Sequence, residues 1–279
     1  MEVRRLLKEQ LLRRFLELSG NIYPDLVRVF YTNLQFNGDI LVSHVKGVDL
    51  EITNEVWTTV TGLKFSGLRI NRGTGVVDEF NKMQFYKNCL KNPQARVTKF
   101  GVRGLKLNER LVALIVSWIL TPRGSNHSTL SEEDLVLICC IMNKIKLNWI
   151  HIIKDHMQKA TRLCDFCYPY SILITKFLQY FEVDLEEELA EVVKSSSEVN
   201  SGSLSKMGFT KINGFWVSKD GDPAASSSVV QAEDEDEDVE EPVAAENARP
   251  SADIGEERIT SMKSFERLVI NKMDNLAEN

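Results

Sequence analysis

Four residues in the second half of the sequence are of the types that bind zinc: His151, His156, Cys164 and Cys167. The Cys-x2-Cys half has zinc-ligand spacing, and the order His, His, Cys, Cys is that of integrase zinc domains. However, the histidines are five positions apart in a predicted helix, which places their side chains about 140° apart around its axis. Only seven residues separate His156 from Cys164, too few for the supporting structure of such a domain. We therefore expect two helix histidines and two loop thiols, with no bound metal.

The carboxylate clusters do not have the pattern of a catalytic site. Residues 132–134 and 186–188 each fall in the first turn of a predicted helix, where the helix dipole favours negative charge. A two-metal nuclease needs acids that converge from several elements, usually strands, and this sequence predicts few strands. Neither a GxxxxGK[ST] phosphate loop nor a GxSxG elbow occurs. We expect a protein that is not an enzyme and needs no cofactor.

Charge is distributed unevenly along the 279 residues, whose formal net charge is −6. Residues 1–218 carry a net charge of +5, whereas residues 219–257 contain 14 acidic and 2 basic side chains. Between positions 87 and 123, eight basic residues stand against one acid, Glu109. These eight are the candidate contacts for nucleic acid: Lys87, Lys91, Arg96, Lys99, Arg103, Lys106, Arg110 and Arg123.

Such a basic stretch has two interpretations. It has few aromatic neighbours (Phe85, Tyr86 and Phe100), so base stacking is weakly supported. Lysine and arginine alone would bind phosphates in a way that is sensitive to salt and indifferent to sequence. The alternative is an ordinary solvated surface, or one covered by the acidic segment of the same chain.

The chain after position 217 has the composition of a tether followed by a short helix. Residues 218–257 combine Pro, Ser and Ala with a continuous run of carboxylates, Glu233–Asp238, and contain no aromatic residue. Too little apolar surface is present to offset ordering of the backbone, so we predict a disordered acidic linker. Residues 258–279 place apolar side chains at helical spacing, which predicts an amphipathic helix that docks on a protein partner or self-associates.

For residues 1–217 the pattern predicts a mainly α fold, an irregular multi-helix globular domain with one or two short β-strand pairs. Strands are expected within 40–52 and in a hairpin around Asn213-Gly214. Capping residues that we assign are Thr53, Asp78 or Glu79, Asn108, Ser131 with Asp134, Asn148 and Asp184. The expected helices span 3–18, 24–34, 54–61, 80–90, 109–120, 132–145, 149–160, 170–181 and 185–194.

The apolar content, 43% of residues, is sufficient for a core. Helix 109–120 is apolar on nearly every face and should be central, and Cys139-Cys140 should be buried as small hydrophobic residues. The longest apolar run, Leu111–Leu120, has ten residues, about half of the roughly 20 that cross a bilayer. The N-terminal sequence lacks the apolar region of a secretory signal, so we expect an intracellular protein with reduced cysteines. The pattern does not distinguish nucleus from cytoplasm.

Four blocks of sequence resemble the plant transposon protein domain, which occurs in the envelope-like reading frames of Athila-type LTR retroelements. The blocks are Tyr23–Leu34, Val45–Ile52, Arg110–Ile153 and Pro169–Leu185, and the similarity covers roughly residues 15–189. The resemblance implies a plant retroelement-derived protein. It supplies no catalytic residue, and the absence of a spanning segment and a signal departs from the envelope-like description.

We therefore expect a non-enzymatic interaction or structural protein of a retroelement. The alternative is a nucleic-acid-binding accessory protein, similar to Gag, that uses the basic region 87–123. A transposase or nuclease comes third. The sequence does not identify the partner or the oligomeric state.

Overall fold

The structure is a computed structural model and describes residues 2–70, 80–162, 168–191, 209–212 and 215–218. The fold is mainly α with short strands, as predicted. The helices are α1 (Glu2–Glu9), α2 (Arg13–Leu16), α3 (Pro24–Thr32), α4 (Asn54–Thr61), α5 (Lys82–Cys89), α6 (Leu107–Ile115), the π-helix η1 (Val116–Leu120), α7 (Glu132–Met142), α8 (Trp149–Ala160) and α9 (Ser171–Tyr180). The strands are β1 (Gln35–Asn37), β2 (Ile40–Val45), β3 (Val48–Ile52), β4 (Phe209–Ile212) and β5 (Phe215–Ser218).

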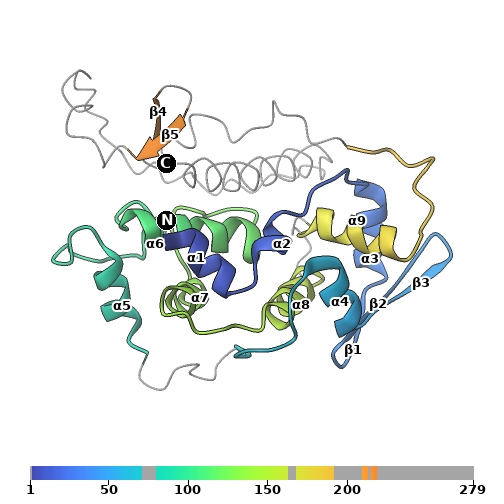
Figure 1. Cartoon of the computed structure of the whole chain (residues 1–279), viewed down its shortest axis with the longest axis horizontal. Helices are drawn as coiled ribbons and strands as arrows, with labels where there is room; N and C mark the ends of the chain where they lie inside the picture. Colours follow the sequence, from blue (N-terminus) through green and yellow to red (C-terminus); the bar gives the residue numbers. More distant parts are fainter. Residues whose placement is uncertain (1, 71–79, 163–167, 192–208, 213–214, 219–279) are drawn as a thin grey trace, which may run out of the picture.

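The helical body is elongated, with α5 at one end and the β1–β2–β3 sheet at the other (Figure 1). In the half that contains α5, α1 packs on α6 and α7, and α7 also contacts α5. In the other half, α3, α4 and α9 pack together with β2 and β3. Between them lies α8, whose buried Trp149 bonds to Gln10 in one half and whose Lys154 bonds to Asp39 in the other.

The N-terminal segment differs from the prediction. The expected helix 3–18 is divided into α1 and α2, because Leu11 has a left-handed backbone with φ of 60°. Its neighbour Gln10 is 4% exposed and bonds through its side chain to residues 145–149. The bonds to these distant partners fix the end of α1. The spacing of apolar residues within 3–18 cannot predict them.

The strands within 40–52 are confirmed as an antiparallel hairpin in which Val45 pairs with Val48. The turn residues Lys46 and Gly47 both have positive φ, 49° and 80°, as a type I′ turn requires. The structure adds β1, at residues for which the sequence predicted no strand. That helix ends at Thr32, and Asn33 donates its side-chain N–H to the His44 carbonyl, which directs the chain into the sheet.

Several helix ends are confirmed at the predicted residues. The Thr53 hydroxyl accepts from the Val56 amide, and Gly62 ends α4 with φ of 73°. Ser131 and Asp134 form a reciprocal capping box at the start of α7. The Asn148 side chain accepts from the His151 amide at the start of α8. In each case the donor and acceptor lie within three residues, so local sequence is sufficient.

Other predicted caps were wrong. Helix α5 begins at Lys82, with Asn81 as its N-cap, rather than at Asp78 or Glu79. Helix α6 begins at Leu107, so Asn108 lies inside it. Asp184 caps no helix, because its carboxylate accepts from the Glu186 amide in a turn. In place of the described part of helix 185–194, Glu191 pairs with Ile22 through two backbone hydrogen bonds.

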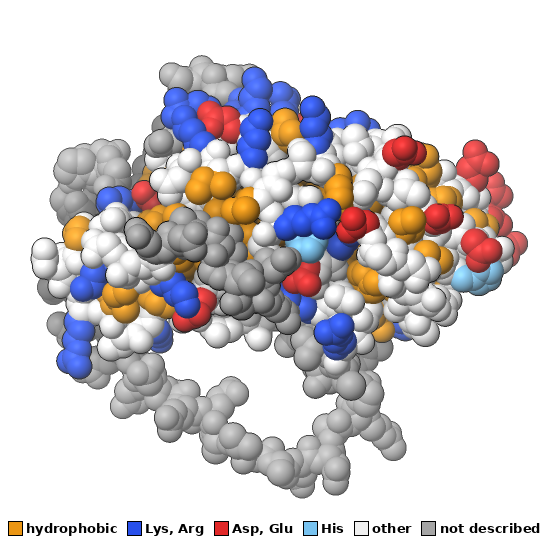
Figure 2. Space-filling model, turned by 90° about the horizontal axis from the view of Figure 1, so that it is seen from below, with side chains coloured by type: hydrophobic (Ala, Val, Ile, Leu, Met, Phe, Trp, Pro, Cys, Tyr) orange, Lys and Arg blue, Asp and Glu red, His pale blue; other side chains and the backbone are white. Residues whose placement is uncertain are grey.

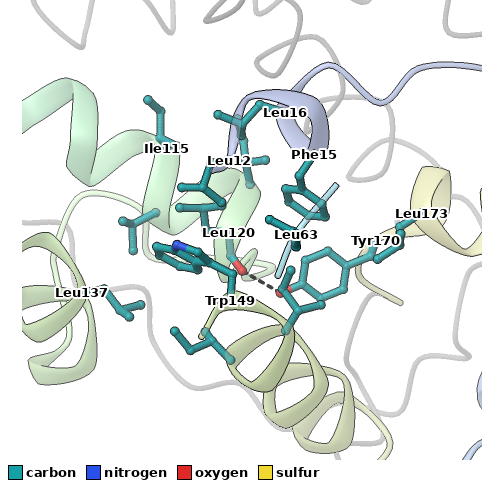
Figure 3. Packing of buried hydrophobic residues seen from close by; sticks show 14 of the residues in the cluster. Leu12, Phe15, Leu16, Leu63, Ile115, Leu120, Leu137, Trp149, Tyr170 and Leu173 are labelled. Carbon is teal, nitrogen blue, oxygen red and sulfur yellow. Dashed lines mark hydrogen bonds between the residues drawn. The ribbon is translucent and has the colours of Figure 1, made fainter. Parts of the chain in front are cut away.

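The predicted central helix is confirmed as buried, but its last five residues, η1, are wound as a π-helix. The wider turn lets Thr121 donate both its amide and its hydroxyl to the Val116 carbonyl, at 2.8 and 3.0 Å. The Leu120 carbonyl accepts from the Tyr170 hydroxyl at 2.7 Å (Figure 3). Around this bond pack Leu12, Phe15, Leu63 and Trp149.

Three cysteines lie in the described part of the chain, and Cys89 and Cys140 are buried there as small hydrophobic groups. Cys140 is fully buried, as predicted, whereas Cys139 is only half-buried. Burial raises the pKa of Cys140 to about 11 and that of Cys89 to about 12, so both remain protonated near neutrality.

The remaining predictions fall partly outside the described residues. The second hairpin is confirmed, since Ile212 pairs with Phe215 across the predicted Asn213-Gly214 turn, whose own residues are not described. The acidic segment, residues 219–257, and the predicted C-terminal helix, residues 258–279, also lie outside the described residues, so the domain boundaries stay predictions. In the described part of the chain, every helix is too short or too polar to cross a bilayer.

Candidate functional site

Six of the eight predicted basic residues lie in one region of the fold, which we call the basic surface: Lys87, Lys91, Arg96, Lys99, Arg103 and Lys106. It lies on α5 and on the loop from 91 to 106, at one end of the body (Figure 1). Lys87 is half-buried and the other five are exposed. No acidic residue occurs between positions 82 and 106, so the surface contains no carboxylate of its own.

The loop folds back on the end of α5. Leu90 and Leu105 form an antiparallel bridge, with the Lys91 amide 3.0 Å from the Gly104 carbonyl. The Lys106 ammonium donates to the Asn88 carbonyl at 2.8 Å. Carbonyl groups at the C-terminal end of a helix favour a nearby cation, which helps to hold Lys106 beside the helix end. Residues distant in the loop are thereby brought to one place.

A second set of bonds fastens the middle of the loop. The Tyr86 hydroxyl donates to the Gly101 carbonyl at 2.7 Å, and its ring contacts Phe100 edge-on at 5.1 Å. Backbone bonds join 100–102 to 128–130, the segment before α7. Tyr86 is 3% exposed, so it supports the loop and cannot serve as a stacking platform for bases.

The other two predicted residues lie elsewhere in the fold. Arg110 is 2% exposed, and its guanidinium donates to the Leu105 carbonyl at 3.0 Å, so it is buried beneath the loop. Arg123 forms an ion pair with Asp134, the capping residue of α7, whose side chain is 6% exposed. Both arginines stabilise the structure that carries the basic surface, and neither belongs to it.

One element of this supporting structure was missed by the sequence analysis. The rings of His127 and Trp118 are stacked with centroids 3.8 Å apart. Burial and, secondarily, the charge of Arg123 lower the pKa of His127 to about 4, so its imidazole is neutral at physiological pH. Nothing in the local pattern pairs position 118 with position 127.

The zinc-like set is not assembled by the described residues. The buried His156 lies on α8 with Nε2 2.7 Å from the Pro122 carbonyl. His151 is half-buried on the same helix, and Cys164 and Cys167 are outside the described residues. Among the residues that the structure describes, no three His, Cys, Asp or Glu side chains are grouped to hold a metal ion.

A buried lysine was also missed. The Lys154 ammonium on α8 binds the Asp39 carbonyl and, at 3.1 Å, the Asn54 side chain. It lies over the rings of Trp57 and Phe65, and burial lowers its pKa to about 8. A lysine with a lowered pKa can act as a nucleophile. Here the amine is only 7% exposed and joins α8 to the β1–β2 turn and α4, which is a structural role.

Acidic side chains gather at the opposite end of the body from α5. In Figure 2 they concentrate at the right-hand end, over the β2–β3 hairpin, while Lys and Arg lie in separate groups across the rest of this face. Glu188 pairs with Lys46 of the hairpin at 3.0 Å, which places the acidic stretch 182–191 at this end. The body therefore has charges of opposite sign at its two ends.

The chain matches a family model, described as a putative plant retrotransposon-related domain, over residues 10–184. It belongs to this family. The predicted resemblance to a plant retroelement protein is thus confirmed, and the protein is retroelement-derived. No curated protein and no solved structure matches the chain.

The retrotransposon-related domain extends from the buried Gln10 to Asp184, just after α9, so it coincides with most of the described helical body. The basic surface lies inside the matched range. The acidic stretch 182–191 and the acidic segment 219–257 lie at its end or beyond it.

Proposed function

We propose that this retroelement-derived chain is a non-enzymatic interaction protein that acts through its exterior. The support is that three buried polar side chains each form a hydrogen bond to a backbone carbonyl. Tyr31 bonds to the Pro169 carbonyl, Tyr170 to the Leu120 carbonyl and His156 to the Pro122 carbonyl. A carbonyl only accepts hydrogen bonds, so each of these groups is a donor committed to the backbone. Side chains of types that could catalyse a reaction are thereby used to hold the fold.

Two measurements test this proposal. Purified full-length protein incubated with DNA or RNA and Mg²⁺ or Mn²⁺ should produce no cleavage or strand transfer. Cross-linking in cells should recover a bound macromolecule. Cleavage that follows the protein through purification and is lost in a carboxylate variant would contradict the proposal.

A second candidate, favoured by the acid-free basic surface, is binding of the nucleic-acid phosphate backbone. Among the described residues, Lys87, Arg96 and Lys99 form no ion pair, so their charges are not neutralised by the body. Contacts of this kind position a polyanion without reading its sequence. We therefore propose binding that does not depend on sequence and weakens with salt.

The test replaces three charges of the basic surface, with Lys87→Gln, Arg96→Gln and Lys99→Gln in one full-length variant. The matched control is Lys8→Gln, Arg28→Gln and Lys64→Gln, which removes three exposed positive charges elsewhere. Each lost phosphate contact should reduce the magnitude of the slope of log K against log salt concentration by about 1. The slope of the first variant should therefore be smaller than that of wild type by about 3. Equal slopes in the variant and the control would eliminate this surface as the binding site.

A further inference from the structure

The position of the basic surface determines which acids of the same chain can reach it. Glu132 contacts Lys82 beside the surface, but the acidic stretch 182–191 is held at the opposite end of the body by the pairing of Glu191 with Ile22. Figures 1 and 2 show these two ends far apart along the long axis. Within the described part of the chain, the large acidic group therefore cannot neutralise the basic surface.

The acidic segment, residues 219–257, has the charge and the reach to do so. Its 14 carboxylates exceed its 2 basic residues by 12, and six of them are consecutive between Glu233 and Asp238. Forty-one residues separate Glu191, the last described residue of the helical body, from Glu233. Ten of these residues belong to the β4–β5 hairpin, in which Phe209 pairs with Ser218, so the reach is set by the other 31. They can span up to ~100 Å, whereas a compact body of this size is about 40 Å across.

We propose that the acidic segment binds the basic surface of its own chain and competes there with nucleic acid. Linkage within one chain gives the segment an effective concentration in the millimolar range, so weak charge contacts are sufficient for occupancy. The competition rests on the proposed phosphate-binding function, whereas the contact itself does not. Both contacts are between opposite charges. Salt therefore weakens the binding of the acidic segment and the binding of nucleic acid to the basic surface.

The contact is tested by zero-length carbodiimide cross-linking of the full chain, which joins lysine amines to carboxylates in direct contact. A mixture of ¹⁴N- and ¹⁵N-labelled protein separates links within a chain from links between chains. We expect Lys87, Lys91, Lys99 and Lys106 to join carboxylates of 219–257 within one chain at low salt. These links should disappear near 1 M salt, where the screening length is about 3 Å. Equal linking to Lys8 and Lys64, or links only between chains, would overturn the proposal.

The competition is tested with two full-length variants that each lose four negative charges. One carries Glu233→Gln, Glu235→Gln, Glu237→Gln and Glu240→Gln; the control carries Glu51→Gln, Glu182→Gln, Glu186→Gln and Glu187→Gln. At low salt the first should bind DNA more tightly than the control, by up to about tenfold, since it loses four of the 14 carboxylates of the internal competitor and three of the six in its continuous acidic run. Equal affinities would refute the competition. If no form binds DNA, the phosphate-binding function fails and the competition fails with it, while selective cross-links would still establish the contact.

Discussion

The side-chain oxygen of Gln10 accepts a hydrogen bond from the indole nitrogen of Trp149 at 3.2 Å, across 139 positions of sequence. The same oxygen accepts from the Leu147 amide, and the Gln10 amide group donates to the Ile145 carbonyl at 2.7 Å. One buried side chain thus satisfies three groups in the connection between α7 and α8. It ties the end of α1 to the centre of the fold.

Replacement of Gln10 by Leu should destabilise the protein strongly. Leucine fills similar space but leaves the three partner groups without a hydrogen bond in the interior, and each such group costs about 1–3 kcal/mol. We expect a loss of about 3 kcal/mol in the free energy of unfolding, measured by urea denaturation followed through Trp fluorescence. Lys8→Leu, at an exposed position in the last turn of α1, is the control. A loss below 1 kcal/mol for Gln10→Leu would show that water or a rearranged loop replaces these bonds.

Arg123→Met should reduce stability without affecting nucleic-acid affinity. The substitution leaves the Asp134 carboxylate largely buried without its cation, although Ser131 still donates to it. Because Arg123 is partly exposed, we expect a loss of about 2 kcal/mol in the free energy of unfolding, less than for a fully buried pair.

Lys99→Met, the comparison variant, should have the opposite effect. It should weaken DNA binding while the free energy of unfolding stays within about 0.5 kcal/mol of wild type. Reduced DNA affinity in folded Arg123→Met would place this arginine back among the contacts.

Stability should fall on mild acidification because of His127. Its pKa is lowered from 6.5 to about 4 in the folded protein, so between these values the unfolded chain binds more protons than the folded one. The free energy of unfolding should therefore decrease as pH falls from about 6.5 toward 4, and the contribution of neutral His127 is complete above pH 6.5.

The measurement compares wild type with His127→Phe, which keeps a ring against Trp118 but cannot be protonated. Phenylalanine loses the hydrogen bond between the imidazole and the Arg123 backbone, but it loses none at Nδ1, which has no partner among the described residues. Unfolding free energies at several pH values should fall less steeply for the variant. Ser128→Ala, at the adjacent exposed position, controls for effects of the loop. Parallel curves for His127→Phe and wild type would disprove the assigned titration.

Tyr86→Phe should loosen the loop that carries the basic surface. The change removes the hydroxyl that donates to the Gly101 carbonyl and should cost about 1 kcal/mol. The backbone amides of Lys91 and Lys106, which bond to Gly104 and Cys89, should exchange with solvent faster. If the surface works as a preorganised unit, DNA affinity should fall about two- to threefold. Met83→Leu on the exposed side of α5 is the control, and unchanged exchange rates in Tyr86→Phe would contradict this account.

The confirmed features are those in which the interacting groups are close in sequence. The Thr53 and Asn148 caps, the capping box of Ser131 and the turn at Gly47 each involve residues within three positions of one another. The errors occur where partners are distant. Helix 3–18 breaks because Gln10 bonds to residues beyond position 140, and the expected helix after Asp184 is replaced by pairing with Ile22.

The candidate site shows the same division. Composition identified the region rich in lysine and arginine, but it could not separate Arg110 and Arg123 from the other six. A charged side chain near the surface of a domain is exposed or buried according to what packs over it. The buried Arg110 donates to the Leu105 carbonyl, and Asp134 from the following helix pairs with Arg123.

The amino-acid sequence alone determined the mainly α class, the positions of most helices, the segregation of charge along the chain and the relationship to a retroelement family. These properties follow from periodicity, local capping and composition, which act over a few residues. Only the tertiary structure decided that six basic residues share one end of the body while acidic residues gather at the other. It also assigned Gln10, His127 and Lys154 to structural roles, because burial and hydrogen bonding of a side chain depend on residues that the chain brings together only by folding.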